Sequence, residues 1–190
     1  MKQYLLLLSF TLWCFNLYAQ PKCELKSCKI VYEFFDGINT GYKTIIFTDS
    51  GLIDKQTVIS KIDTSKLPPE AKSMFTVLNE TKQLKIQTKD TIYLIDLISM
   101  SGIKSTRWGV GLSVGDPFIT KVGTDTFMNR VCEVYDAKVS KIWYWKGVYL
   151  KKELTFNEGG QVYERAILID ENYIVKEDEF TVPSGVKFDN

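Results

Sequence analysis

Apolar and polar side chains alternate over much of the chain, which is typical of half-buried β-strands. One face of the segment CKIVYEFF would carry Cys28, Ile30, Tyr32 and Phe34. In YKTIIFTD, Ile45 and Phe47 fall opposite Thr44 and Thr48. A weaker third run, LIDKQTVISKID, follows. The runs recur about every ten residues and are separated by turn sequences such as DGINTG, which predicts an antiparallel meander.

Two further hairpins are indicated later in the chain. KQLKIQTKDTIYLIDL predicts a hairpin with Thr88, Lys89 and Asp90 at its turn. LTF and QVYERAILID flank the turn sequence NEGG and predict another. The closing EDEFTVPSGVKFDN reads as a short extended segment. No internal repeat or linker interrupts this pattern, so we expect one mainly β domain over residues 20–190.

Helical signals are few and short. Pro69 followed by apolar residues at helical spacing, among them Met74 and Phe75, predicts a helix over 69–79. A strand over 73–78 is the alternative, because Phe75 and Val77 also alternate. Asp116-Pro117 resembles a helix start and predicts one or two turns over 118–122. The expected fold is therefore a single curved antiparallel sheet, an incomplete β-barrel, with one or two short helices as a lid.

The first 19 residues have the pattern of a secretory signal peptide. Lys2 precedes an apolar stretch over 4–15, and a small-residue cleavage site ends at Ala19. Cys14 and Cys23 do not follow a small residue at the end of that stretch, so no lipid anchor is expected. We expect an exported protein, periplasmic or secreted. No later run is apolar enough to predict a transmembrane segment in the mature chain.

Three cysteines remain after removal of the leader: Cys23, Cys28 and Cys132. An exported protein meets an oxidising compartment, so a disulfide is expected, but three thiols cannot all pair. Proximity along the chain favours a Cys23–Cys28 bridge. A bridge from either residue to Cys132 would constrain more of the unfolded chain and stays open as an alternative.

Charge and side-chain inventory exclude several function classes. The mature chain carries equal numbers of acidic and basic residues, with the signs interspersed, which argues against a nucleic-acid partner. The chain has no histidine, so Ser-His-Asp and Cys-His sites are excluded. The glycines of WGVGLSVG lack the lysine and the strand-to-helix context of a phosphate loop. We expect no metal, no cofactor, no catalytic residue and no enzymatic activity.

Aromatic residues are the chemistry that remains, at 13% of the chain. Trp143 and Trp145 share one strand face, opposite Ile142 and Tyr144. Core packing accounts for aromatics of this kind in most cases. Because several strands are apolar on both faces, either the sheet closes into a barrel or one face accepts a hydrophobic guest.

Four segments resemble a family of exported bacterial proteins of unassigned function: KIVYEFFDG, TIYLIDL, VGTDTFMNRVCEVYDAKVSKIWYWKGVYLKKE and FTVPSGVKF. That family is similar to the LolA/LolB-like lipoprotein carriers. The resemblance implies an incomplete β-barrel whose short helices cover a hydrophobic concavity. The carriers' opening arginine has no matching motif here, with Arg107 the one positional candidate, and the chain lacks the acceptor protein's lipid anchor.

The leading hypothesis is a non-enzymatic carrier or binding domain for an acyl chain or a lipoprotein tail. The candidate wall and lid residues are Phe47, Met74, Phe75, Tyr93, Trp143 and Trp145. The alternative is an envelope scaffold or sensor domain, with a barrel filled by its own side chains and an edge or loop that docks another protein.

Overall fold

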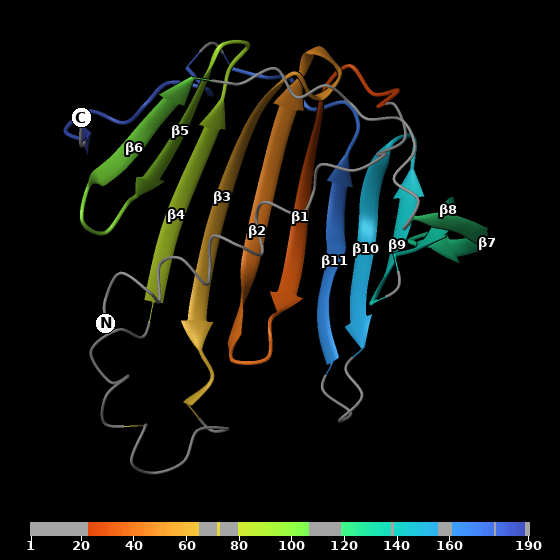
Figure 1. Cartoon of the computed structure of the whole chain (residues 1–190). Coiled ribbons are helices and arrows are strands. Elements are labelled where there is room, and N and C mark those ends of the chain that lie inside the picture. Colours follow the sequence, from red (N-terminus) through yellow and green to blue (C-terminus); the bar gives the residue numbers. More distant parts are fainter. Residues whose placement is uncertain are drawn as a thin grey trace.

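The structure is a computed structural model that describes residues 23–64, 72, 80–106, 119–137, 139–155, 161–176 and 178–188. Within these residues it forms one 12-stranded sheet (Figure 1). The strands are β1 (Cys28–Phe35), β2 (Asn39–Thr48), β3 (Ile53–Ile62), β4 (Glu80–Gln87), β5 (Thr91–Asp96), β6 (Ser101–Thr106), β7 (Thr120–Phe127), β8 (Arg130–Asp136), β9 (Ser140–Trp145), β10 (Val148–Thr155), β11 (Gln161–Asp170) and β12 (Lys187–Phe188).

The sheet is open and almost entirely antiparallel. Its order is β12-β6-β5-β4-β3-β2-β1-β11-β10-β9-β8-β7, and the two edge strands do not pair with each other. The short β12 runs parallel to β6, so the sheet is mixed at that edge. Figure 1 shows the β7–β8 hairpin turned across the direction of the other strands. The predicted fold class, a mainly β single sheet that does not close, is confirmed.

The local patterns explain most of these strands. Cys28–Phe35, the run with the clearest alternation, is β1, and it pairs with β2 along its whole length. The hairpin predicted around Thr88–Asp90 is formed by β4 and β5, and LTF and QVYERAILID pair as β10 and β11. The glycine-containing stretch after Met100 proves to be the strand β6.

The helical predictions fare differently. The helix expected over 118–122 is wrong where the structure describes it, because Thr120–Val122 belong to β7. The β-branched residues of TKVGTDTF favour a strand, and pairing with β8 outweighs the local Asp-Pro signal. The predicted lid helix over 69–79 lies outside the described residues except for Lys72, which is helical. A short 3-10 turn spans Asp49–Gly51, and no described helix is long and apolar enough to cross a membrane.

Strand register divides the sheet into two faces. Tyr32 on β1 pairs with Lys43 on β2 and with Ala166 on β11, and Glu164 pairs with Lys152 on β10. We call the face that carries these side chains the tyrosine face. On β4 and β5 the opposite face carries Leu84, Ile86 and Ile95.

The chain after β11 covers that opposite face. Leu84, Ile86 and Ile95 form a buried cluster with side chains from the C-terminal segment, namely Phe180, Val182, Val186 and Phe188. Figure 1 shows this segment running along one end of the strands from β11 to β6. A second, larger cluster includes Cys28, Ile30, Tyr32, Phe47, Cys132, Trp143 and Leu150.

Candidate functional site

A polar cluster lies in the middle of the tyrosine face. The Tyr32 hydroxyl donates to the Tyr149 carbonyl oxygen at 2.7 Å. The Tyr149 hydroxyl donates to Glu164 Oε1 at 2.8 Å and accepts from Lys43 Nζ at 2.5 Å. Lys43 also forms an ion pair with Glu164. Strands β1, β2, β10 and β11 therefore each contribute one member of a connected hydrogen-bond network.

The two tyrosine rings are stacked and carry a cation beside them. Their centroids are 5.1 Å apart with an interplanar angle of 25°. Lys43 Nζ lies 5.4 Å from the centroid of Tyr32 and 5.3 Å from that of Tyr149, within cation–π range. Burial, followed by the nearby Glu164 carboxylate, raises the pKa of both phenols well above the ordinary value. Both hydroxyls therefore remain protonated donors at neutral pH.

Lys152 lies next to this network without joining it. It stands opposite Glu164 on one side and Ile142 on the other. Burial lowers the pKa of the Lys152 ammonium; the nearby Lys43 lowers it further and Glu164 raises it. Two cations thus face a single carboxylate, and that carboxylate is already engaged by Lys43 and Tyr149.

The rest of the tyrosine face changes character from one side to the other. Toward β9 it carries Ile142 and Tyr144, which are both buried. The Tyr135 ring lies edge-on to the Tyr144 ring, with a centroid distance of 5.5 Å. Over β3 and β4 it is polar, because Asp54 is bonded to Gln56 at 3.0 Å and to Lys85 at 3.4 Å. The part of the face beside Lys152 is therefore apolar.

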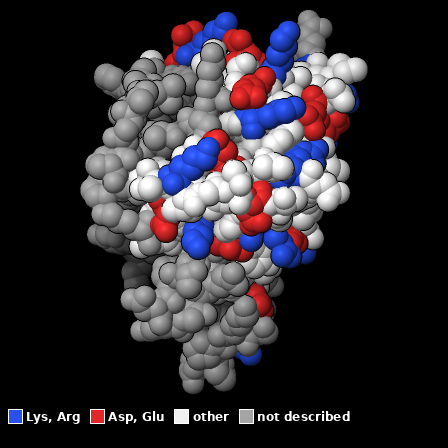
Figure 2. Space-filling view, turned by 90° about the vertical axis from the view of Figure 1, so that its right-hand side faces the viewer, with Lys and Arg blue, Asp and Glu red and all other residues white. Residues whose placement is uncertain are grey.

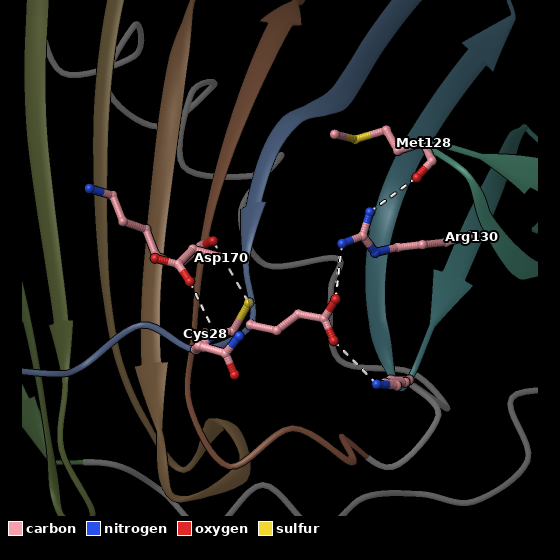
Figure 3. Close-up of polar contacts among 8 residues, drawn as sticks. Cys28, Met128, Arg130 and Asp170 are labelled. Atoms are coloured by element: carbon pink, nitrogen blue, oxygen red, sulfur yellow. Dashed lines mark hydrogen bonds and ion pairs between the residues drawn. The ribbon is translucent and has the colours of Figure 1, made fainter.

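A second polar group sits at one end of the sheet, around Arg130 (Figure 3). Arg130 donates to the Met128 carbonyl oxygen at 3.0 Å and to Glu171 Oε1 at 2.9 Å. Its guanidinium lies 4.8 Å from the Trp145 ring, and Lys146 Nζ lies 4.6 Å from the same ring. Partial burial opposes ionisation of Glu171, but hydrogen bonds from Arg130 and Lys146 outweigh it and lower its pKa. These contacts connect the β7–β8 and β9–β10 turns to the end of β11.

The opposite face has a shallow pocket over β1–β3 and β11. Its volume is about 270 Å³, and it is lined by Glu33, Phe34, Thr40, Gly41, Tyr42, Ile59, Lys61 and Tyr163. Tyr42 is 55% exposed and Ile59 is 39% exposed, so apolar surface there is open to solvent. Its volume is below the range of roughly 300–1,000 Å³ typical of small-molecule sites.

The structure does not place the predicted wall residues on one surface. Phe47 is buried on the tyrosine face, opposite Cys28. Tyr93 is on the other face, 5.7 Å from the ring of Phe188. Trp143 and Trp145 point away from Ile142 and Tyr144, as predicted, and the Trp143 indole donates to Asp125 at 2.9 Å. Met74, Phe75 and Arg107 lie outside the described residues.

All three cysteines described are free thiols, so the predicted Cys23–Cys28 bridge is not formed in the structure. Cys28 and Cys132 are fully buried. Burial raises the pKa of Cys28 to about 12, and the carboxylates of Glu171 and Asp170 contribute to the increase. Figure 3 shows Cys28 and Asp170 near the Arg130 group. The bridge stays a prediction.

Sequence reasoning missed Lys43, Tyr149, Lys152, Glu164 and Arg130. A signal for Lys43 was present: strand alternation puts it on the same face as Ile45 and Phe47, where a charge needs a partner. Alternation likewise puts Glu164 on the same strand face as Ala166, so its charge also needs a partner. Their meeting required the β1–β11 pairing, which joins segments far apart in the chain.

Charge on the side of the molecule near β7–β11 is mixed. Figure 2 shows basic and acidic side chains interspersed there, with no continuous patch of one sign. Ion pairs formed by residues of these strands include Arg130–Glu171 and Lys151–Glu153.

Comparison with known proteins adds information about the fold. No family model matches the chain, and no curated protein matches it. Among solved structures, it is similar to an uncharacterized conserved protein from Thermus thermophilus, with a TM-score of 0.58 at 6% identity over 87% of this chain and 90% of that one. It also matches MucB, with a TM-score of 0.49 at 11% identity over 93% of this chain and 64% of that chain.

The chain shares its fold with the Thermus protein. No sequence family is shown.

Proposed function

We propose that this protein is an exported, non-enzymatic binding or carrier domain that holds an acyl chain or a lipoprotein tail against the tyrosine face. The observation that carries the proposal is the open sheet: no second sheet packs on that face among the described residues. Half-buried Leu154 and Tyr135 lie there beside buried Ile142 and Tyr144. A hydrophobic ligand would gain about 25 cal/mol for each Å² of still exposed apolar surface, such as that of Leu154 and Tyr135, that it buried.

Export and lack of catalysis belong to the same proposal. The leader pattern of residues 1–19 supports export to the periplasm or beyond. Two observations support a binding role. The chain has no histidine, the most frequent general base, and the carboxylate of Glu164 is paired with Lys43.

The test is native mass spectrometry of the protein purified from a bacterial envelope, together with titration of a fluorescent fatty-acid probe. Co-purified lipid and saturable probe binding are expected. Repeated absence of both would overturn the proposal.

A pair of leucine substitutions tests where the ligand lies. Leu154→Lys puts a charge on the apolar part of the tyrosine face and should weaken probe binding about tenfold or more, since burying a leucine contributes roughly 1.5–3 kcal/mol. Leu168→Lys makes the same change at a position 47% exposed, opposite Val31 on the other face, and should leave binding unchanged. Equal effects of the two changes would contradict a site on the tyrosine face.

The second candidate function is a scaffold or sensor domain that docks another protein. The pocket beside Tyr42 and Ile59 favours it, since both side chains are exposed on the face away from the tyrosine network. Tyr42→Ser combined with Ile59→Ser would then abolish capture of an envelope protein in crosslinking experiments and leave lipid binding intact.

A further inference from the structure

Of the lysines around the tyrosine network, Lys152 is the one without a carboxylate of its own among the described residues. Lys85 is paired with Asp54 at 3.4 Å, and Lys43 is paired with Glu164. Lys152 stands on the same face, opposite Glu164 in the register of β10 and β11. Within the part of the chain that the structure describes, Lys152 has no hydrogen bond or ion pair.

Glu164 makes its direct contacts with groups other than Lys152. Its Oε1 atom already accepts from the Tyr149 hydroxyl at 2.8 Å and pairs with Lys43. A partly buried ammonium that shares its nearest carboxylate with a second lysine is costly, because burial removes water and one carboxylate cannot neutralise two cations. A bound anion would remove this cost.

The Lys152 ammonium is nevertheless within reach of a ligand. Lys152 is only partly buried in the structure, so part of its side chain keeps contact with solvent. An anion can approach it from that side.

The surroundings of Lys152 are apolar in the other directions. Ile142, 9% exposed, is its neighbour across the β9–β10 ladder, and half-buried Leu154 is the next residue of β10 on the same face. A free inorganic anion would make no use of this apolar surface. A single-chain molecule with an anionic end and a hydrocarbon body would engage both the ammonium and the apolar surface.

We propose that Lys152, assisted by Lys43, binds the carboxylate or phosphate headgroup of a single-chain amphiphile whose hydrocarbon body lies along Ile142 and Leu154. This deepens the proposed function and rests on it. The headgroup would accept charge-assisted hydrogen bonds from Lys152 Nζ. Tyr149 and Glu164 position Lys43 beside the same site.

The test is isothermal titration calorimetry of the mature protein with dodecanoate, dodecyl phosphate and the neutral dodecanol. The wild type should bind one or both anions about tenfold more tightly than dodecanol, the size expected for one charge-assisted contact. The comparison of the two anions decides between a carboxylate and a phosphate headgroup. Lys152→Met should lose this preference while dodecanol affinity stays the same.

Lys151→Met is the matched control. It makes the same change one residue earlier in β10, where the ammonium lies 4.2 Å from the Trp143 ring on the other face. It should leave all three affinities unchanged. Lys152→Arg keeps the charge and should keep the preference, which leaves the proposal testable even if Lys152→Met fails to fold.

The outcomes separate the two proposals. If the wild type binds none of the three ligands, the proposed function itself fails. If the wild type binds the two anions no more tightly than dodecanol, the proposed headgroup site is wrong and hydrophobic binding stands. The same conclusion follows if Lys152→Met weakens the binding of anions and dodecanol equally.

Discussion

Lys152 gives the tyrosine face a pH dependence that can be measured. Its pKa is lowered by burial and by Lys43 on β2, while Glu164 on β11 acts in the opposite direction. The ammonium therefore loses its proton below the ordinary lysine value of about 10.4. Since the charged form binds the anion, affinity for dodecanoate is full at neutral pH and falls as pH rises through this lowered pKa.

Calorimetry from neutral pH to about pH 11 checks this expectation against Lys152→Arg, whose guanidinium stays charged over that range. The variant should keep its affinity where the wild type loses it. A parallel decline in the two proteins would assign the effect to another group.

The cysteines provide a second prediction at the scale of single residues. Cys28 and Cys132 are buried and Cys23 is half-buried, and burial raises the pKa of all three thiols. Because the thiolate is the reactive form, iodoacetamide should label the native reduced protein slowly, and Cys23 first.

Mass spectrometry after timed labelling measures the order, with the urea-unfolded protein as control. Labelling of the unreduced protein in urea also tests the predicted bridge: one reactive thiol would indicate a disulfide, and three would exclude it. Rapid labelling of native Cys28 would contradict its burial.

At the scale of elements, Gly41 lets β2 and β3 approach where Phe34 lies over the strand. A Cβ atom at Gly41 would lie 2.2 Å from the Ile59 carbonyl oxygen and 2.9 Å from the tip of the Phe34 ring. The backbone oxygen cannot move away without disturbing the β2–β3 ladder. Gly41→Ala should therefore lower the free energy of unfolding by about 1–3 kcal/mol, as overpacking does.

Urea denaturation followed by tryptophan fluorescence measures this change. Thr40→Ser, at the exposed neighbouring position, should change stability by less than about 0.5 kcal/mol. A neutral Gly41→Ala would show that the two strands separate readily.

Elements were predictable where local signals and pairing agreed. Alternation in CKIVYEFF and the turn at Thr88–Asp90 gave β1 and the β4–β5 hairpin, because neighbouring segments pair directly. The helix predicted over 118–122 failed because a local cap signal cannot weigh the ladder that Thr120–Phe127 forms with β8. The parallel β12 was not predictable, since its partner β6 lies more than 80 residues earlier.

At the scale of the whole molecule, the C-terminal segment seals one face of the sheet. Phe188 contacts Tyr93 at a ring distance of 5.7 Å and packs against the cluster of Leu84, Ile86 and Ile95. Phe188→Ala should lower the free energy of unfolding by about 1–3 kcal/mol, less than for a fully enclosed phenylalanine. Ile174→Ala, at a side chain that is 86% exposed, should have almost no effect.

Thermal unfolding by circular dichroism measures both variants. If Phe188→Ala leaves the unfolding temperature unchanged, the segment is a loosely attached tail. In that case the Tyr93 face would itself become a candidate binding surface.

The residues of the candidate site were also predictable only in part. Sequence pattern identified Trp143 and Trp145 as one face and Phe47 as an inward-facing side chain, because period-two alternation needs only neighbouring residues. It could not show that Tyr93 faces the other way from Phe47, because that depends on the register of three successive ladders from β2 to β5.

The sequence by itself determined the strand-rich class, the leader pattern, the missing histidine chemistry and the near-neutral charge, because each depends on composition or on residues close together in the chain. Only the tertiary structure decided that the sheet stays open and which side chains share a face. The pairing of β1 with β11 brings Tyr32 and Lys43 to Tyr149, Glu164 and Lys152 across more than 100 residues of chain. Contacts at such separation depend on the register of the whole sheet, and no local pattern encodes them.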